Sequence, residues 1–403
     1  MDLKSLEEQY NEYKNSGKVL DMSRGKPATK QLDNLSSLLT EISDNDDCYS
    51  ENGMDCRNYG CLEGIPEAKR MFANVLGVKP ENVVVCGNSS LNIMYDTIST
   101  IFMFGFNGCE PWSKQEKRRF LCPVPGYDRH FAITELFGFE MIPIPMNDDG
   151  PDMDLVREYA ENDDTVKGIW CVPKYSNPTG ITFSDRVVKE FAALDPAAKD
   201  FVVMWDNAYA VHDLTDTPDT LLSILPEAEK NGKEDMIFQF TSTSKISWSG
   251  AGISCTAMSE KNKKWFLKFM GIKTIGYDKL AMLRHARMLN AHLPEVMARH
   301  ASVIYPKFKL CYEYFERLAN EVEGFRFSKP NGGYFINVYV KPGKAKKIVS
   351  LAAEAGLKLT SAGASFPYGK DPDDSNIRIA PTYPSIESLE DALKLFTICV
   401  KLA

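Results

Sequence analysis

Between residues 82 and 205, short apolar runs alternate with helix-like stretches, and this alternation constrains the fold more than any other feature of the chain. Strands that alternate with helices are typical of a mostly parallel sheet with helices on both faces. The runs that predict strands are 82–86, 119–122, 140–144, 166–172 and 201–205, followed by 236–240 and 253–258. The sequence therefore predicts an α/β fold.

The pattern changes after residue 258, where long helices and short strands replace the regular alternation. The expected elements are helices over 260–270 and 277–318, strands around 334–340 and 376–379, and a last helix from residue 385. We therefore expect a large domain over 50–290 and a smaller α+β domain formed by 1–49 and 291–403. Within the large domain, the charged stretch 110–118 (EPWSKQEKR) is interpreted as a surface insertion.

Composition excludes several classes of protein. The formal net charge is -8, from 47 basic and 55 acidic residues without a long basic run, so a nucleic-acid surface is not favoured. The first 18 residues lack the apolar core of a signal peptide, and the most apolar stretch, 91–106, falls short of the roughly 20 residues that span a bilayer. We expect a cytoplasmic protein with neither nucleic acid nor membrane as a partner.

The cysteines and histidines do not form a metal-binding pattern. The 10 cysteines include no C-x-x-C pair, and the 5 histidines include no H-E-x-x-H motif. Several of the cysteines lie in or beside strand-like runs, where a thiol acts as a small apolar side chain. We expect reduced core thiols and no metal.

A lysine set among small hydroxyl residues follows the apolar run 236–240. The stretch Thr241–Lys245 reads TSTSK, and Lys245 would lie on the loop between two strands. Such sheet edges are where α/β proteins bind ligands, and the amine could form a Schiff base. A polar turn with a solvated lysine is the alternative, because lysines are mostly exposed.

Two other motifs are expected at the same edge. The sequence SNPTG closes the run 166–172 and brings Asn177 there, while Asp206 ends the run 201–205 and Tyr209 follows it. A carboxylate at the end of an apolar strand is costly unless it meets a cation or a hydrogen-bond donor. The alternatives are a simple turn around Asn177 and a helix N-cap at Asp206.

In their order along the chain, Asn177, Asp206, Tyr209 and Lys245 resemble the class I/II aminotransferase family of fold-type I pyridoxal-phosphate enzymes. The resemblance covers nearly the whole chain. It is closest to an aspartate aminotransferase subgroup, on the stretches Ser23–Pro27 (SRGKP), Pro123–His130 (PVPGYDRH) and Asp206–Tyr209 (DNAY). It implies an aspartate aminotransferase-like fold, with a mostly parallel seven-stranded-type sheet, and pyridoxal 5'-phosphate as the cofactor.

The resemblance also implies a role for each matched residue at the cofactor ring. Lys245 would hold the cofactor covalently and move a proton of the substrate. Asp206 would keep the pyridine nitrogen protonated, so that the ring acts as an electron sink. Asn177 and Tyr209 would hydrogen-bond the ring phenolate, and Tyr127 would stack on the ring.

The phosphate is expected at a helix N-terminus, where backbone amides and the helix dipole favour an anion. Asn88, Ser89 and Ser90 would provide this site, and Ser242 and Ser244 would add hydroxyls. Tyr59 matches a tyrosine that reaches the phosphate of the neighbouring subunit, which implies a homodimer. The chain departs from the family pattern at Gly250–Gly252 (GAG), where many relatives carry a phosphate-binding arginine.

Substrate recognition requires a cation for the α-carboxylate, and Arg378 matches the family's C-terminal arginine. Gly25 matches a glycine near the substrate, and Asn177 also borders the substrate. For the second carboxylate of an acidic amino acid we favour Arg24. The other candidates are Arg57, Arg129 and Lys174.

The predicted function is transfer of an amino group between L-aspartate and 2-oxoglutarate, by a ping-pong mechanism with a pyridoxamine intermediate. A pyridoxal-phosphate-dependent lyase or decarboxylase is the first alternative, because it would use Lys245, Asp206 and Tyr209 in the same way. A ligand-sensing aminotransferase-like module is the second. It is less favoured, because such modules carry an N-terminal winged helix and this chain reaches Ser23 almost at once.

Overall fold

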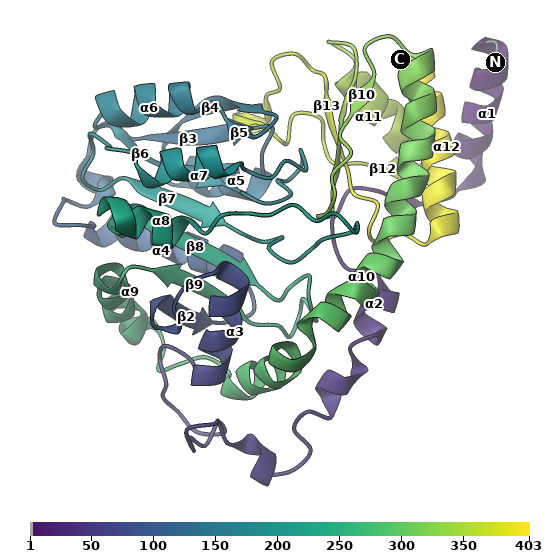
Figure 1. The fold of residues 1–403 in the computed structure, drawn as a ribbon. Helices are drawn as coiled ribbons and strands as arrows, with labels where there is room; N and C mark the ends of the chain where they lie inside the picture. Colours follow the sequence, from purple (N-terminus) through teal and green to yellow (C-terminus); the bar gives the residue numbers. More distant parts are fainter. Residues whose placement is uncertain (1–2) are drawn as a thin grey trace.

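The computed structural model describes residues 3–403, which form one large sheet covered by helices and a smaller body that contains both chain ends (Figure 1). Within these residues the large sheet has the strand order β2-β9-β8-β7-β6-β3-β4-β5. Its strands are β2 (Val83–Cys86), β3 (Arg119–Val124), β4 (Glu140–Asn147), β5 (Gly150–Pro151), β6 (Val166–Cys171), β7 (Val202–Asp206), β8 (Ile237–Ser242) and β9 (Ser254–Met258).

The sheet is mostly parallel, as the sequence predicts. Strands β4, β3, β6, β7 and β8 run parallel, whereas β9 is antiparallel to both of its neighbours and β5 is a short antiparallel edge. Every residue of β2, β6, β7, β8 and β9 is buried, because helices cover both faces. The carboxyl ends of β6, β7 and β8 therefore meet at one edge of the sheet. The α/β fold class is confirmed.

Two helical layers enclose the large sheet. Helices α4 (Ser90–Phe104), α5 (Asp128–Leu136) and α9 (Glu260–Lys273) share an apolar cluster with one face. The opposite face packs against α3 (Pro66–Leu76), α6 (Met153–Asn162), α7 (Asp185–Ala192) and α8 (Ile224–Asn231). The strand ends that carry polar side chains are thus held between two packed layers.

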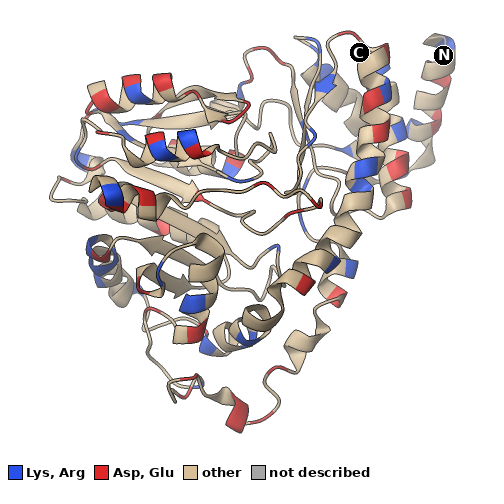
Figure 2. Ribbon diagram, in the orientation of Figure 1, with Lys and Arg blue, Asp and Glu red and all other residues tan. Residues whose placement is uncertain are grey.

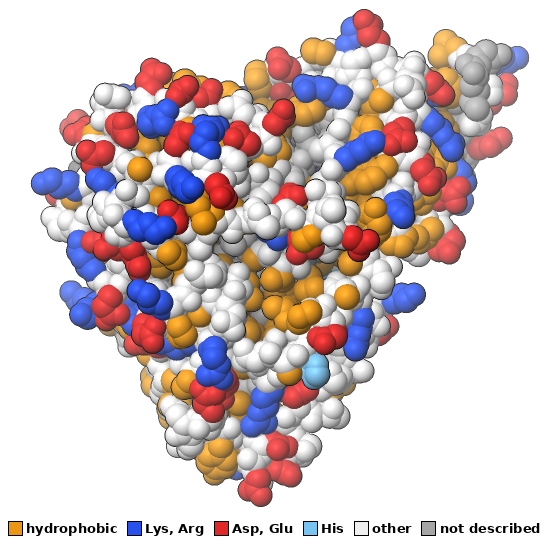
Figure 3. Space-filling view, viewed as in Figure 1, with side chains coloured by type: hydrophobic (Ala, Val, Ile, Leu, Met, Phe, Trp, Pro, Cys, Tyr) orange, Lys and Arg blue, Asp and Glu red, His pale blue; other side chains and the backbone are white. Residues whose placement is uncertain are grey.

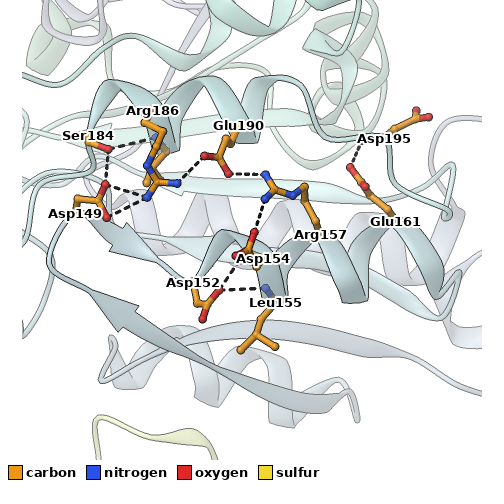
Figure 4. A network of polar contacts seen from close by, with 11 residues as sticks. Asp149, Asp152, Asp154, Leu155, Arg157, Glu161, Ser184, Arg186, Glu190 and Asp195 are labelled. Atoms are coloured by element: carbon orange, nitrogen blue, oxygen red, sulfur yellow. Dashed lines mark hydrogen bonds and ion pairs between the residues drawn. The ribbon is translucent and has the colours of Figure 1, made fainter.

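Ion pairs join α6 to α7 on the outside of the molecule (Figure 4). Arg157 bridges to Glu190 at 2.6 Å, and Glu190 also binds Arg186, which reaches Asp149 at 3.0 Å. Exposed pairs of this kind contribute about 0–1 kcal/mol each. They align the two helices without being a main source of stability.

The smaller body combines the N- and C-terminal parts of the chain. Its sheets are β10 (Arg326–Phe327), β11 (Ile336–Tyr339) and β13 (Asn376–Ile379), and the pair β1 (Leu20–Asp21) with β12 (Leu357–Lys358). Its helices are α1 (Leu3–Ser16), α2 (Thr29–Asp33), α10 (Lys279–Glu321), α11 (Ala345–Glu354) and α12 (Ile386–Leu402). Leu20 pairs with Leu357, so the two ends of the chain complete one unit.

Helix α10 runs from the large sheet to the smaller body and is kinked on the way (Figure 1). The kink is at His292 (φ -132°, ψ 16°), just before Pro294, whose ring cannot continue the helical hydrogen bonding. We propose this kink as the boundary between the expected domains 50–290 and 1–49 with 291–403. Leu35 and Leu38 belong to the range 1–49 of the expected small domain, but they pack in a cluster with residues of the large sheet.

Only part of the stretch 110–118, which was expected to be a surface insertion, lies on the surface. Lys114, Glu116 and Lys117 are exposed, but Trp112 is fully buried and its Nε1 donates a hydrogen bond of 2.9 Å to Asp200 Oδ2. The stretch is therefore anchored to the large domain by its one large aromatic residue.

Charges of both signs are spread over the ribbon and over the face in view (Figures 2 and 3). Across residues 3–403, we find no helix long and apolar enough to cross a membrane, and no group of three or more His, Cys, Asp or Glu side chains placed to hold a metal ion. All ten cysteines are free thiols.

Candidate active site

Asp206, the last residue of β7, is a buried carboxylate with one oxygen paired and one free. Its Oδ2 lies 3.1 Å from His130 Nε2 in α5, and the His130 ring stacks on Trp170 with centroids 4.3 Å apart. Asp206 Oδ1 is buried without a hydrogen-bond partner among the described residues. A buried carboxylate oxygen that lacks a donor is costly, so this atom is suited to an N–H from a bound molecule.

Lys245 lies on the loop after β8, at the same edge of the sheet. Its side chain is half-buried, and Nζ lies 4.9 Å from the centroid of the Tyr209 ring. Burial lowers the pKa of the Lys245 amine, and the Asp206 carboxylate opposes this by raising it. Burial, then Tyr127 and Asp206, raise the pKa of Tyr209 well above its ordinary value, so this phenol stays protonated. The structure thus places Lys245, Tyr209 and Asp206 in one electrostatic neighbourhood.

Tyr127 ends the turn between β3 and α5 and completes an aromatic wall. Its ring meets His130 edge-on, with centroids 4.9 Å apart. Burial, with smaller effects of Asp206 and Asp128, raises the pKa of Tyr127 to about 12. A cavity of about 20 Å³ borders Tyr127, His130 and Asn177. A surface hollow of about 710 Å³ lies elsewhere, around Leu62 and Arg70.

The loop from β2 to α4 meets the lysine loop. Ser244 Oγ donates to the Asn88 carbonyl at 3.1 Å, and Ser242 Oγ donates to Ser244 Oγ at 3.0 Å. Ser89 takes the N-cap position of α4, which begins at Ser90. Hydroxyls and the positive end of a helix dipole therefore face one small region.

Gly252 cannot be replaced by the arginine of many relatives without a rearrangement. A Cβ atom at Gly252 would lie 2.6 Å from Thr243 Oγ1 and 3.0 Å from the Trp248 carbonyl. Thr243 Oγ1 is itself fixed, because it accepts a hydrogen bond of 3.0 Å from Ile253 N. The backbone packing of the lysine loop thus takes up the space where that side chain would begin.

Arg378, in β13, is buried and held by three oxygen atoms. Nη1 donates to Asp128 Oδ1 at 2.9 Å and to Asn177 Oδ1 at 3.4 Å, while Nη2 donates to Thr360 Oγ1 at 3.3 Å. Nε has no partner among the described residues. A guanidinium fixed in this way, with a free N–H, is prepared for a carboxylate.

Phe335 links Gly25 to this arginine. The Arg378 guanidinium lies over the Phe335 ring, 5.1 Å from its centroid, and a Cβ atom at Gly25 would lie 2.4 Å from Phe335 Cζ. A side chain at position 25 would therefore require the Phe335 ring to move. Arg24 is exposed beside Gly25.

The structure does not bring every predicted residue to one place. Lys245, Asp206, Tyr209, Tyr127, Asn177 and Arg378 are joined by the contacts above, whereas the side chain of Tyr59 is 84% exposed on the surface. Sequence reasoning assigned no role to His130, Asp128, Thr360 or Phe335. His130 and Asp128 lie within the stretch Pro123–His130 (PVPGYDRH), and its resemblance to the family could have pointed to both residues.

The donor set fits pyridoxal 5'-phosphate. The free Asp206 Oδ1 matches the pyridine N–H, the Lys245 amine can form a covalent bond with an aldehyde, and the hydroxyls near Asn88 suit a phosphate. The phosphate part of this fit lacks a guanidinium at position 252.

Comparison with known proteins gives a consistent result. A family model described as "Aspartate amino-transferase" matches residues 2–403. An aspartate aminotransferase from Corynebacterium glutamicum is 45% identical over 401 residues, which cover 99% of this chain and 92% of the relative. A crystal structure of an aspartate transaminase from the same organism has a TM-score of 0.95 at 44% identity, over 99% of this chain and 94% of that one.

A more distant structure shares the fold. It is an α-aminoadipate aminotransferase from Thermus thermophilus, complexed with N-(5'-phosphopyridoxyl)-L-leucine, with a TM-score of 0.77 at 17% identity over 98% of this chain and 94% of that one. The family model and the 45% identity both extend over nearly all residues of the chain. The chain therefore belongs to the aspartate aminotransferase family, within the fold-type I, class I/II aminotransferases, and is a transaminase.

Proposed function

We propose that the protein transfers an amino group from L-aspartate to 2-oxoglutarate by a ping-pong reaction, with pyridoxal 5'-phosphate as its cofactor. The observation that carries the proposal is the buried Asp206 carboxylate, whose Oδ1 has no partner among the described residues while Lys245 lies at the same sheet edge. A carboxylate left unpaired at such a place is stabilised by a cationic N–H of a ligand.

The chain's own residues divide the work. When bound, the cofactor supplies an electron sink for the carbon from which a proton leaves. Lys245 is the base that takes and returns this proton, because burial lowers the pKa of its amine and makes the neutral form more available. His130 fixes Asp206, and Tyr209 and Asn177 would donate hydrogen bonds to the ring oxygen of the cofactor.

Arg378 would bind the α-carboxylate of every donor. Its guanidinium is oriented by Asp128, Asn177 and Thr360 before a substrate arrives, so little orientational freedom is lost on binding. For the second carboxylate of aspartate we propose Arg24, which is exposed next to Gly25 and can reorient. The name of the Corynebacterium glutamicum relative supports aspartate as the donor.

We also propose a homodimer, in which Tyr59 reaches the phosphate of the neighbouring subunit. Bulky apolar side chains are exposed on two adjoining segments: Tyr59 at 84%, Ile272 at 83% and Ile275 at 65%. The two segments adjoin at Gly276, where a Cβ atom would lie 2.6 Å from the Gly60 carbonyl, and the Lys279 amine binds the main-chain carbonyls on both sides of Tyr59. Exposed apolar groups of this kind mark protein interfaces. The expected location of the enzyme is the cytoplasm.

The test uses the purified protein with aspartate and no acceptor. A transaminase converts one aspartate per subunit, so oxaloacetate should equal the protein concentration and the visible absorbance of the bound cofactor should fall. Addition of 2-oxoglutarate should restore the absorbance and release glutamate. Pyruvate or alanine formed in excess over protein would instead identify the lyase or decarboxylase alternative. A ligand-sensing module would release no product at all.

A further inference from the structure

Tyr334 lies in the loop before β11, and its hydroxyl reaches the main chain of Lys245. The side chain is fully buried, and Oη donates a hydrogen bond of 3.2 Å to the Lys245 carbonyl. The same hydroxyl accepts a hydrogen bond of 3.1 Å from Gln31 Nε2, in α2. One phenol thus joins the lysine loop to the N-terminal part of the chain.

The chemistry of the partners fixes the direction of each hydrogen bond. Gln31 Oε1 accepts from the Ala28 N–H at 2.9 Å, so Nε2 directs its two hydrogens to Tyr334 Oη and to His300 Nδ1, the latter at 2.9 Å. His300 Nδ1 must therefore be an acceptor, and burial agrees with this, because it lowers the pKa of His300 to about 4. The Lys245 carbonyl can only accept a hydrogen bond, so the Tyr334 hydroxyl is the donor.

The network is rigid on both sides. Gln31, His300 and Tyr334 are all at most 1% exposed and come from three distant parts of the chain. Thr243 O accepts from Ile246 N at 2.9 Å and from Ser247 N at 2.7 Å, which makes a tight turn around Lys245. The amine of Lys245 meanwhile lies over the Tyr209 ring, so the main-chain carbonyl and the side chain of this residue are held by different partners.

We propose that Tyr334 and Gln31 are positioning residues for Lys245. They hold its main-chain carbonyl in place, so that only the side chain of Lys245 moves when the amine passes between cofactor and substrate. They also connect the main chain of Lys245 to the N-terminal segment that carries Gly25. The proposal rests on the proposed role of Lys245 as the residue that binds the cofactor. A displacement of about 1 Å in a reacting group can cost about 10²-fold in rate.

The test compares Tyr334→Phe and Gln31→Met with Tyr312→Phe in the full-length enzyme. Tyr312 Oη donates to the Pro330 carbonyl at 3.1 Å, so this control removes a similar hydrogen bond away from Lys245. We expect kcat to fall about 3- to 10-fold in both positioning variants, as for the loss of one hydrogen bond, with KM for aspartate unchanged. The kcat of the double variant should fall no further than that of Tyr334→Phe alone, because both changes break the same series of hydrogen bonds from Gln31 through Tyr334 to Lys245.

A second measurement does not depend on turnover. Amide hydrogen exchange of the cofactor-free protein, followed by mass spectrometry, should be faster over residues 243–249 in Tyr334→Phe and Gln31→Met than in the wild type. Tyr312→Phe should leave this segment unchanged. Wild-type kcat together with wild-type exchange in both positioning variants would overturn the inference. A wild-type protein that does not bind the cofactor through Lys245 would overturn the proposed function instead.

Discussion

Asp128 and Arg378 are 250 positions apart in the sequence, yet Asp128 Oδ1 accepts a hydrogen bond of 2.9 Å from Arg378 Nη1. This pair fixes a buried guanidinium at the proposed substrate site. Because the charge of Arg378 is partly balanced before a substrate arrives, its remaining N–H groups are oriented without a large desolvation cost.

Arg378→Ala should lower kcat/KM for every amino-acid donor, because the α-carboxylate is common to all of them. Loss of one partner of a buried charged pair costs about 2–5 kcal/mol, which corresponds to roughly 30-fold or more in kcat/KM. Steady-state kinetics with several donors measure the effect, and the cofactor absorbance should persist. Arg378→Lys keeps the charge but loses the planar fork, so it should recover only part of the activity. If kcat/KM fell for one donor only, Arg378 would bind the side chain of that donor and not the α-carboxylate.

His130→Phe should leave the stack on Trp170 and remove the hydrogen bond to Asp206. A buried carboxylate that loses its donor costs about 1–3 kcal/mol, so both the free energy of unfolding and kcat should fall. Denaturant unfolding and turnover measure the two effects. His130→Gln places an amide N–H near the position of Nε2 and should restore part of both. Equal losses in the Phe and Gln variants would contradict a donor role for His130.

Lys245→Ala should abolish the visible absorbance of the bound cofactor and reduce turnover by at least the roughly 10²–10⁴-fold that a positioned acid or base contributes. Absorbance spectra and kcat measure this. Lys263→Ala is the matched control: Lys263 is a buried lysine whose amine donates to the Glu81 carbonyl at 2.7 Å, away from the site. The control should lose stability but keep the absorbance. Wild-type turnover in Lys245→Ala would refute the central claim.

Capture of the cofactor by the apo-protein should depend on pH through Lys245. Only the neutral amine attacks an aldehyde, and burial lowers the pKa of Lys245 from 10.5 while Asp206 raises it. The capture rate should therefore rise with pH through a midpoint below 10.5. Asp206→Asn removes the opposing effect and should move the midpoint lower still. Stopped-flow absorbance over a pH series measures both midpoints, and an upward shift in the variant would contradict the assigned charge effect.

Strands β2, β6, β7, β8 and β9 could be predicted because every residue in them is buried, so that each strand reads as one apolar run. The run 236–240 and the observed Ile237–Ser242 differ by one or two residues at each end. The two-residue strands β1 and β12 could not be predicted, because two residues carry no period and Leu20 meets its partner Leu357 only through tertiary packing. Trp112 was misplaced for a similar reason: its hydrogen-bond partner, Asp200, lies 88 positions away.

The site divides in the same way. Asp206 ends a strand and Lys245 follows one, so the sequence could place both at one edge of the sheet, where parallel strands bring their carboxyl ends together. The contacts of Arg378 with Asp128 and Thr360 carry no local signal. Neither does the hydrogen bond from Tyr334 to Lys245, which depends on how a loop 89 positions away packs. The domain limits and the roles of the individual residues stay predictions.

The close contact between Gly252 and Thr243 also limits how this lineage of enzymes can change. A single codon change from glycine to arginine at position 252 would bring Cβ within 2.6 Å of a hydroxyl that Ile253 N already uses, so that substitution is expected to be disfavoured before any benefit at the phosphate appears. The arginine could be accommodated only if both Thr243 and the Trp248 carbonyl moved. Variants of this chain are therefore expected to retain the glycine.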